Sequence, residues 1–239
     1  MIKPDIVFED EYLLILDKPS GWIVNSAVTT KEQPVIQNWL RDNFDYKISK
    51  DDNLRSGIVH RTDKETSGLL IVAKTESTFR ELQRQFKQRE VEKTYITLVH
   101  GKVSPKEGTI EVPVGRLPWR RDRFGIVAGG RDSKTDYKVI DLFKKGNDYY
   151  SLLECFPKTG RTHQIRIHMK HINHAIVSDY FYAGRKTSRN DREWCPRLFL
   201  HAKNISFTHP VHNKKIKFEL PLSNDLNKAL KSLRLEKEV

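Results

Sequence analysis

Cysteine is scarce in this sequence, which has only two, Cys155 and Cys195, among its 239 residues. They lie far apart and form no CxxC pair, so the sequence supports neither a disulfide framework nor a zinc ribbon. Long apolar runs are also missing, because no stretch approaches the roughly 20 residues that a membrane-spanning helix needs. The sequence has no internal repeat and no low-complexity tract. These absences predict a globular protein with reduced thiols and no membrane segment.

Acidic residues are outnumbered, with 31 Asp and Glu against 43 Lys and Arg, which gives a formal net charge of +12. This excess favours a polyanionic partner such as nucleic acid, with an anionic membrane surface as the alternative. Residues 1–22 contain acidic side chains and pass directly into a strand-like pattern, unlike a signal peptide. We therefore expect a cytoplasmic protein, with a monomer as the default state.

Hydrophobic residues make up 37% and charged residues 31% of the chain, as in globular proteins. Apolar and alternating runs predict strands at residues 12–16, 69–73, 94–99, 135–140, 149–155, 198–200, 205–208 and 215–220. Helical spacing predicts helices at residues 34–44, from Ser77 with Ser77 or Thr78 as N-cap, and near the C-terminus. The pattern indicates a single α+β domain over residues 1–239, with a mixed, largely antiparallel sheet flanked by helices. Two lobes across a cleft are the alternative.

The stretch His60–Thr75 changes abruptly from charged residues to an apolar run. Asp63 stands between Arg61 and Lys64, so neighbouring cations would hold its carboxylate ionised. The small residues Thr66–Gly68 form a turn into the expected buried strand, and functional residues favour loops that a rigid element positions. Asp63 is therefore a candidate catalytic residue, and a solvated turn without function is the alternative.

A second candidate block runs from Lys158 to Met169. Gly160 permits a tight turn, Thr162 is expected to cap a helix, and Asn173 is expected to end it in a left-handed conformation. Arg161, His163 and Gln164 would then cluster at the helix N-terminus, where free amide groups and the helix dipole attract anions. The alternative is a structural helix whose polar residues face water.

Four histidines crowd this region, namely His163, His168, His171 and His174. Their spacing is not HExxH, no carboxylate or cysteine accompanies them, and arginines lie among them. The sequence therefore does not predict a metal site.

A third feature is the Arg-rich segment 116–125, which is followed by further basic residues up to Lys134. Its predicted RNA-binding residues are Arg116, Trp119, Arg120, Arg121 and Arg123. Cations in such a segment follow phosphates, while Trp119 or Phe124 can stack on a base. We expect an RNA-binding loop, with an ordinary solvated loop as the alternative. No standard RNA-binding module is recognisable.

These blocks occur in a characteristic order. They are LDKPSGW (residues 16–22), GIVHRTDKETSGLLIVAKT (57–75), KTYITLVHG (93–101), TGRTHQIRIH (159–168), SDYFYAG (178–184) and LHA (200–202). Together they span nearly the whole chain, and the sequence resembles the RluA-type pseudouridine synthases. The resemblance implies a pseudouridine synthase-like fold with a central RNA-binding cleft, and it implies no cofactor and no metal.

The resemblance also implies an activity, the isomerisation of uridine in RNA to pseudouridine. The essential aspartate would be Asp63, acting as nucleophile on the uridine or as base toward the ribose, which the sequence does not decide. Arg166 would be its ion-pair partner. Tyr95 would pack on the uracil and assist removal of the C5 proton. Arg61 would fill the space left by the flipped nucleotide, and Arg161 and His163 would contact a stem-loop of rRNA or tRNA.

Three departures from the family pattern affect loop geometry. Thr62 stands where leucine is usual, Ser178 replaces a glycine, and Ala183 interrupts the usual Tyr-Gly pair. The chain begins too close to the first block to include the N-terminal S4 domain of some relatives, so we expect segment 116–134 to provide RNA contacts. The rival interpretations are a non-catalytic RNA-binding protein or RNA chaperone, and a glycosidase, for which a second positioned carboxylate is not evident.

Overall fold

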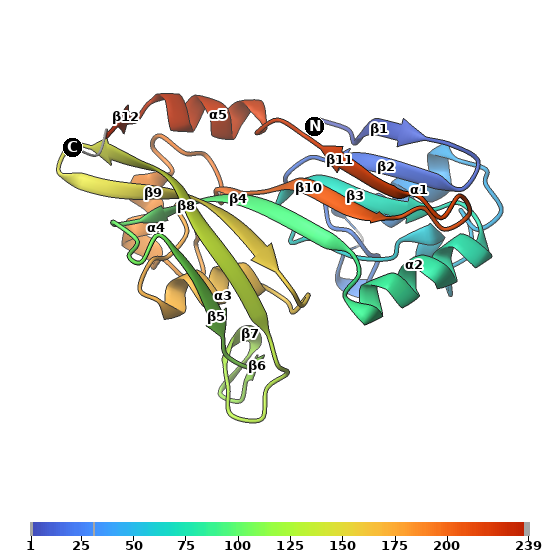
Figure 1. Ribbon diagram of the computed structural model, residues 1–239, viewed down its shortest axis with the longest axis horizontal. Coiled ribbons are helices and arrows are strands. Elements are labelled where there is room, and N and C mark those ends of the chain that lie inside the picture. The colour runs from blue at the N-terminus through green and yellow to red at the C-terminus, as the bar shows by residue number, and fades with distance from the viewer. Residues whose placement is uncertain (1, 31, 237–239) are drawn as a thin grey trace. The chain divides into compact units, whose positions relative to one another are not determined.

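A computed structural model (Figure 1) describes residues 2–30 and 32–236, and the side chains at positions 121 and 122 lie outside this description. The chain forms two compact units, and each has its own hydrophobic core. One unit comprises Met1–Lys93 and Ala202–Pro221, and the other comprises Thr94–His201 and Leu222–Val239. Within the described part of the chain, no helix is long and apolar enough to cross a membrane. The predicted single domain stays a prediction.

The first unit is built on a sheet in the order β1-β2-β3-β10, with β11 paired to β10. Its strands are β1 (Asp5–Glu9), β2 (Leu13–Lys18), β3 (Ser67–Ala73), β10 (Leu200–Thr208) and β11 (Lys215–Glu219). Its helices are α1 (Ile36–Asn43) and α2 (Glu76–Gln88), with short 3-10 turns at Val28–Thr30 and Arg55–Gly57. The β1–β2, β2–β3 and β10–β11 pairings are antiparallel. The strands predicted at 198–200 and 205–208 are one continuous strand, β10. It begins at Leu200, so Leu198 and Phe199 lie outside it.

Strand β2 is buried on both faces because successive side chains point to opposite sides of a sheet. Leu13 and Ile15 enter one cluster, which α2 completes with Phe79 and Leu82. Leu14 and Leu16 enter a second cluster, to which α1 contributes Ile36 and Leu40. The uninterrupted apolar run is thus explained by cores on both sides of the strand.

Helix α2 begins one residue earlier than predicted, at Glu76. Its N-cap is Thr75, whose hydroxyl accepts a hydrogen bond from the Thr78 N–H at 3.3 Å. The predicted caps, Ser77 and Thr78, are wrong because they already lie inside the helix, whereas Thr75 has the extended backbone that a cap requires. The helix ends at Arg89, which adopts a left-handed conformation with φ 64°.

The second unit contains the strand order β4-β9-β8-β12, with β5 paired to β8 and a separate hairpin β6-β7. Its strands are β4 (Glu92–His100), β5 (Glu107–Glu111), β6 (Val114–Leu117), β7 (Arg120–Ile126), β8 (Lys134–Lys145), β9 (Asp148–Pro157) and β12 (Arg234–Leu235). Its helices are α3 (Gln164–His171), α4 (Arg185–Asp191) and α5 (Asn224–Lys231). The neighbouring strand pairs β4–β9, β8–β9, β5–β8, β8–β12 and β6–β7 are antiparallel. The predicted α+β class, with a mixed, largely antiparallel sheet flanked by helices, is confirmed.

The core of the second unit lies between its sheet and helices. Strand β4 contributes Leu98 and Val99, α3 contributes Ile165 and Met169, and α5 contributes Leu226. Helix α3 is therefore fixed in the core from its first residue, Gln164, and follows directly on the loop that precedes it. This arrangement positions the second candidate block.

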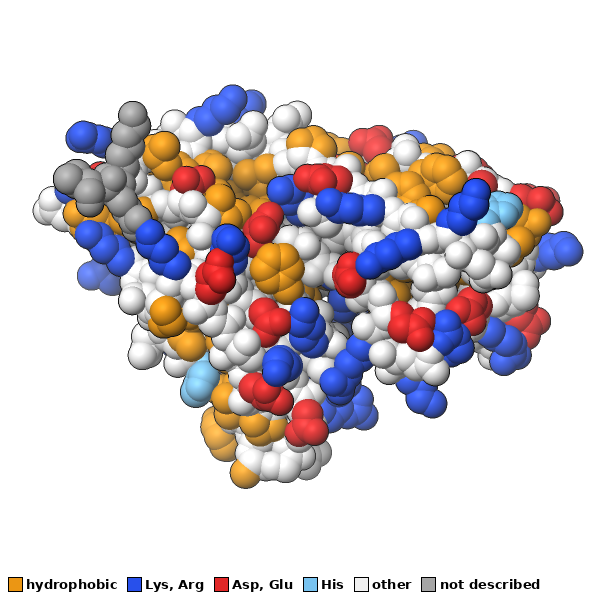
Figure 2. Space-filling view, viewed as in Figure 1, with side chains coloured by type: hydrophobic (Ala, Val, Ile, Leu, Met, Phe, Trp, Pro, Cys, Tyr) orange, Lys and Arg blue, Asp and Glu red, His pale blue; other side chains and the backbone are white. Residues whose placement is uncertain are grey.

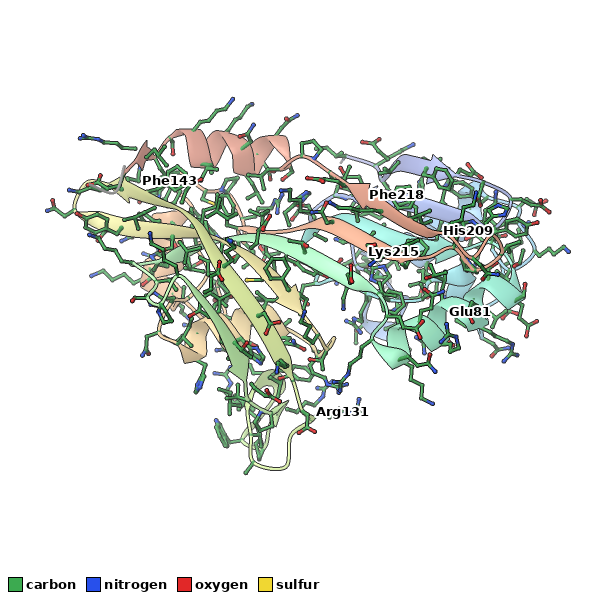
Figure 3. All side chains as sticks on the ribbon, in the orientation of Figure 1. Glu81, Arg131, Phe143, His209, Lys215 and Phe218 are labelled. Atoms are coloured by element: carbon green, nitrogen blue, oxygen red, sulfur yellow. The ribbon has the colours of Figure 1, made fainter. Side chains whose placement is uncertain are left out.

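Segment 116–125 is a β-hairpin rather than the predicted loop. Its strands β6 and β7 are joined by the turn at Pro118 and Trp119, with Leu117 paired to Arg120. The hairpin extends beyond β5 and β8 (Figure 1). At its base, backbone hydrogen bonds of 2.9 and 3.0 Å join Val114 to Arg131, which Figure 3 labels on the returning segment. The prediction missed the hairpin because its strands carry arginines instead of the apolar alternation of a buried strand.

Candidate active site

The loop that carries Asp63 is anchored on its N-terminal side by His60. The His60 Nε2 atom accepts a hydrogen bond from the Ile71 N–H at 2.9 Å, and the ring stacks on Phe86 at a centroid distance of 4.8 Å. Burial, with a smaller effect from the Lys93 charge, lowers the pKa of His60 to about 3. His60 is therefore neutral near pH 7, as its role as hydrogen-bond acceptor from β3 requires.

The other side of this loop is held by the segment LDKPSGW. The Lys64 carbonyl accepts a hydrogen bond from the Gly21 N–H at 2.8 Å and one from the Lys18 ammonium at 3.4 Å. Lys18 is fully buried, and its ammonium also donates to the carbonyl oxygens of Pro19 and Trp22, each at 3.0 Å. A buried ammonium is costly unless its protons are satisfied, so these carbonyls fix the loop as well as the lysine.

Asp63 lies between these two anchors as a half-buried residue, and Arg61 is exposed. The Asp63 carbonyl accepts a hydrogen bond from the Thr66 N–H at 3.1 Å, which closes a turn just before β3. Thr62 is buried, and its hydroxyl has no hydrogen-bond partner among the described residues. The predicted turn at Thr66–Gly68 is wrong, because the turn lies at Lys64 and Glu65 and β3 already begins at Ser67, but Asp63 does lie just ahead of a buried strand, as expected.

Gly68, the second residue of β3, lies at a position that requires glycine. Its φ is +108°, and a Cβ atom at this position would lie 2.3 Å from the carbonyl oxygen of Ala202 on β10. A side chain would therefore meet both an unfavourable backbone conformation and a neighbouring strand. Close contact between β3 and β10 thus fixes the end of the Asp63 loop.

Arg166 lies in α3, in the second unit, where it forms an ion pair with Asp179. Both N–O distances, Nε to Oδ2 and Nη2 to Oδ1, are 2.8 Å. The side chains of Arg166 and Asp179 are 3% and 0% exposed. Such bidentate, buried pairing fixes the guanidinium plane. Asp179 stands in the SDYFYAG block, and no role was predicted for it, although an acidic residue in that block was the available signal.

The predicted ion pair between Arg166 and Asp63 joins residues of two units that are each described alone. It stays a prediction. The predicted packing of Tyr95 on the uracil also stays a prediction. Tyr95 is a half-buried residue of β4, in the second unit, and pairs in register with Cys155.

The loop before α3 is organised by Gln164, which the sequence analysis placed only among the anion-binding residues. Its Oε1 accepts hydrogen bonds from the Thr159 hydroxyl at 2.6 Å and the Arg161 N–H at 3.0 Å. Its Nε2 donates to the Lys134 carbonyl at 3.0 Å and the Thr135 hydroxyl at 2.9 Å. Gln164 is 4% exposed. It therefore has a structural role, tying the loop to β8.

The predicted cap of α3 is wrong, and the predicted stop is confirmed. His163, not Thr162, is the N-cap, and it makes no side-chain cap bond because its backbone is left-handed, with φ 57°. Asn173 is left-handed with φ 65°, as expected of a residue that ends a helix. Arg161 donates from Nε to the Asp132 carbonyl at 3.1 Å.

His163 joins the loop to the hairpin through Tyr182. The Tyr182 hydroxyl donates its hydrogen to the Phe124 carbonyl at 3.0 Å. The same hydroxyl lies 2.9 Å from His163 Nδ1, so in this second contact Nδ1 is the donor and the hydroxyl oxygen accepts. The His163 and Phe124 rings meet edge to face at 6.0 Å. The Arg116 guanidinium lies 4.9 Å from the Phe124 ring centroid. The structure therefore brings Arg116 and His163, two predicted RNA-binding residues, around one aromatic ring.

The remaining hairpin residues differ in exposure. Trp119 is 75% exposed at the turn, and Phe124 is only half-buried, with cationic and aromatic neighbours on its ring. Of the two aromatics predicted to stack on a base, Trp119 has the accessible ring. Arg120 and Arg123 lie on β7, and the side chain of the predicted contact Arg121 lies outside the described residues. On the face drawn in Figure 2, basic and acidic side chains are intermingled.

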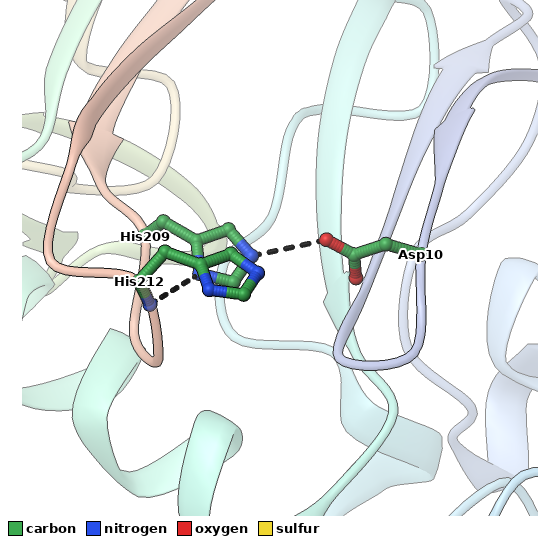
Figure 4. A group of neighbouring side chains, drawn as sticks. All are labelled: Asp10, His209 and His212. Atoms are coloured by element: carbon green, nitrogen blue, oxygen red, sulfur yellow. Dashed lines mark hydrogen bonds and ion pairs between the residues drawn. The ribbon is translucent and has the colours of Figure 1, made fainter.

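One group of side chains in the described residues comes close enough to share a cation, and it includes none of the four histidines between residues 163 and 174. It consists of Asp10, His209 and His212 (Figure 4). His209 Nδ1 accepts N–H groups from Val211 and His212 at 3.2 and 3.1 Å, so Nε2 carries the proton that it donates to Asp10 at 3.0 Å. The nitrogen facing Asp10 thus lacks the free lone pair that a metal needs.

The Asp10 carboxylate already accepts hydrogen bonds from donors of the protein. Burial by itself would raise the pKa of the Asp10 carboxyl, but hydrogen bonds from the Tyr12 and Leu13 N–H groups and from His209 outweigh it and lower the pKa. The cluster is therefore a hydrogen-bonded connection between the β1–β2 turn and the end of β10. The expectation that the protein uses no metal stays a prediction.

Comparison with known proteins agrees with these blocks. The model of a family described as RNA pseudouridylate synthase matches residues 12–171. The chain belongs to the RNA pseudouridylate synthase family. The RluA-type resemblance stated from the motifs is thereby confirmed, and the matched segment includes the Asp63 loop, β4 and α3.

Relatives of this pseudouridylate synthase family are similar over most of the chain. The ribosomal large subunit pseudouridine synthase D of Nitrosomonas europaea is 36% identical over 236 residues, which are 96% of this chain and 65% of that protein. The protein of the same name in Pseudomonas aeruginosa is 35% identical, with 99% of this chain and 74% of that protein covered. This chain thus spans slightly less than two thirds of the Nitrosomonas relative.

Solved pseudouridylate synthase structures share the fold. Human RNA Pseudouridylate Synthase Domain Containing 1 has a TM-score of 0.75 and 25% identity, with 99% of this chain and 90% of that chain covered. Human RNA Pseudouridylate Synthase Domain Containing 4 has a TM-score of 0.70 and 21% identity, with 97% and 94% covered, and supports the fold alone.

Proposed function

We propose that this chain isomerises specific uridines in structured RNA to pseudouridine. The anchored loop around Asp63 carries the proposal. His60 fixes one side of this loop and the buried Lys18 fixes the other, so the backbone that bears the carboxylate is restrained on both sides. Restraint of this kind is what a catalytic group needs, because a misplaced group loses much of its effect.

The chemistry requires no oxidant, reductant or cofactor. The bond from C1′ to N1 breaks, the uracil turns over, and C5 bonds to C1′. C5 then loses a proton and N1 gains one, so the product is an isomer of the substrate with the same atoms and electrons. The protein has to supply an ionised carboxylate, a proton acceptor for C5, and a pocket for a flipped base.

Residue roles follow from the family motifs. Asp63 acts as nucleophile on the uridine or as base toward the ribose, and Arg166 keeps it ionised and oriented. Tyr95 packs on the uracil and assists loss of the C5 proton. Arg61 takes the place of the flipped nucleotide, which its exposed position in the Asp63 loop supports.

The substrate class we propose is ribosomal RNA of the large subunit. Two observations support it: relatives of 36% and 35% identity carry the name ribosomal large subunit pseudouridine synthase D, and the chain has a net charge of +12. Contacts with a stem-loop would come from Arg116, Arg120, Arg123 and Trp119 on the hairpin and from Arg161 and His163 beside it. A monomeric state and a cytoplasmic location complete the proposal.

The test is release of tritium from RNA labelled at uridine C5. We expect the wild type to release tritium from large-subunit rRNA, and Asp63→Asn to lose this release while keeping RNA binding. Asp45→Asn is a matched control, because Asp45 is an exposed carboxylate of the same unit whose partner is Lys50. Nucleoside analysis of the RNA should show pseudouridine with unchanged mass.

Each other outcome identifies a different function. Tight, salt-sensitive RNA binding without tritium release from rRNA or tRNA would favour a non-catalytic RNA-binding protein. Free uracil and an abasic site would indicate a glycosidase. Release from tRNA alone would replace the proposed substrate, and release undiminished in Asp63→Asn would refute the role of Asp63.

A further inference from the structure

Two adjacent aromatic side chains, Tyr180 and Phe181, lie at the surface of the second unit. The two residues are 46% and 39% exposed. The rings meet edge to face at 5.8 Å and an interplanar angle of 84°. Single exposed hydrophobic residues are common, but two neighbouring exposed rings beside a cationic hairpin form a surface that can bind a planar ligand.

The backbone below these rings is fixed by the buried Asp179. Its Oδ1 accepts the N–H groups of Phe181 at 2.9 Å and Tyr182 at 3.1 Å. The same carboxylate is held by Arg166, and the Tyr182 hydroxyl is bonded to the Phe124 carbonyl of the hairpin. The exposed rings therefore belong to a preorganised segment, which reduces the entropy lost when a ligand binds.

Two arginines lie beside Phe181. The guanidinium carbons of Arg123 and Arg166 each lie 5.4 Å from the Phe181 ring centroid. Arg166 is buried and paired with Asp179, so Arg123 is the candidate for a phosphate contact. Arg123 comes from β7, and its Nη1 lies 3.5 Å from the Phe181 carbonyl oxygen. Arginine beside an exposed ring suits a nucleotide, because the base can stack on the ring while the phosphate meets the cation.

We propose that Tyr180 and Phe181 form a stacking site for an unpaired base of the RNA substrate, outside the residues that react with the uridine. The proposal rests on the proposed function, since it takes RNA as the partner. Charge complementarity favours RNA over a protein surface, because the net charge of +12 and the flanking Arg123 match a polyanion.

The experiment measures the affinity of the full chain for a short uridine-containing stem-loop RNA by fluorescence anisotropy. The same stem closed as a plain duplex is the second probe, because its bases cannot stack on the protein. We expect Phe181→Ala to weaken binding of the stem-loop roughly 5- to 150-fold, the range for loss of one stacked base, and to leave duplex binding unchanged. Ile140→Ala is the control, because Ile140 is 42% exposed on β8 of the same unit.

Further variants separate stacking from structural and ionic effects. Phe181→Leu keeps an apolar side chain but loses the ring, so it should also bind the stem-loop weakly, whereas Phe181→Trp should bind as well as the wild type. Neither variant should alter the slope of affinity against salt concentration, while Arg123→Gln should reduce that slope by about 1. Equal thermal midpoints exclude misfolding.

The inference is refuted if Phe181→Leu binds the stem-loop as the wild type does, or if it weakens duplex binding equally. A folded protein that binds neither RNA, but captures a protein through these rings, would also refute it. Failure of the proposed function is distinct: the wild type would release no tritium from C5-labelled RNA, yet stem-loop binding would still depend on the ring at position 181.

Discussion

Replacement of Asp179 by asparagine should destabilise the protein far more than loss of a surface ion pair. The change removes the Asp179 charge from beside the Arg166 guanidinium, whose side chain is 3% exposed. Removal of one partner of a buried pair typically costs about 3–5 kcal/mol. Asparagine keeps an oxygen that can accept the Phe181 and Tyr182 N–H groups, so we expect the lower end, about 3 kcal/mol. That is a large part of the roughly 5–15 kcal/mol by which domains are stable.

A double-mutant cycle tests the physical reason. Arg166→Met alone leaves the buried carboxylate without its cation and should cost a similar amount. In Arg166→Met/Asp179→Asn neither charge remains, so the loss should fall short of the sum of the single losses by about 2 kcal/mol. Urea unfolding followed by circular dichroism gives the free energies. Glu76→Gln is the control, because its pair with Arg80 is exposed and worth at most about 0.5 kcal/mol.

The reasoning is wrong if Asp179→Asn loses no more stability than Glu76→Gln. It is also wrong if the double variant shows the full sum of the single losses, because independent losses would mean that the two charges do not interact. Activity gives a second comparison: Arg166→Lys keeps the charge but not the planar two-point contact, so pseudouridine formation should fall even where stability is retained.

Three further predictions concern single positions. Burial, which outweighs a hydrogen bond, lowers the pKa of His168 to about 4. Below about pH 6.5 the unfolded chain therefore binds more protons at this residue than the folded chain does. Urea unfolding should show that the free energy of unfolding falls between pH 6.5 and 4, with at most about 3 kcal/mol due to His168. His168→Gln should reduce this slope without abolishing it, because burial also lowers the pKa of His60, to about 3. Gly68→Ala should lower the free energy of unfolding by about 3 kcal/mol or prevent folding, because its Cβ would lie 2.3 Å from the Ala202 carbonyl oxygen. The control is Gly129→Ala, where φ is +77° but the space is open, and it should cost only about 1 kcal/mol. Equal losses in the two variants would refute the steric argument. Thr62→Val should raise the melting temperature and the free energy of unfolding, the latter by about 1 kcal/mol, because it removes a buried hydroxyl that lacks a partner among the described residues. A lower stability would mean that the hydroxyl is hydrogen-bonded.

The sequence by itself determined the elements that depend on consecutive residues. The apolar run of β2 and the left-handed stop of α3 at Asn173 follow from local periodicity and backbone preference. The family also follows from the sequence, because its motifs are short and ordered along the chain. Net charge, another property of the sequence alone, pointed to a polyanionic partner.

Tertiary structure decided how side chains are paired, since this depends on segments that meet only after folding. Asp179 holds Arg166 from 13 residues further along the chain, and the Lys18 ammonium reaches the Lys64 carbonyl 46 residues away. The Arg-rich segment became a hairpin because its backbone could pair within itself and with Arg131, a choice that its polar side chains did not reveal. Burial makes these partners obligatory, because a charge or N–H group removed from water must find its hydrogen bonds wherever the fold provides them.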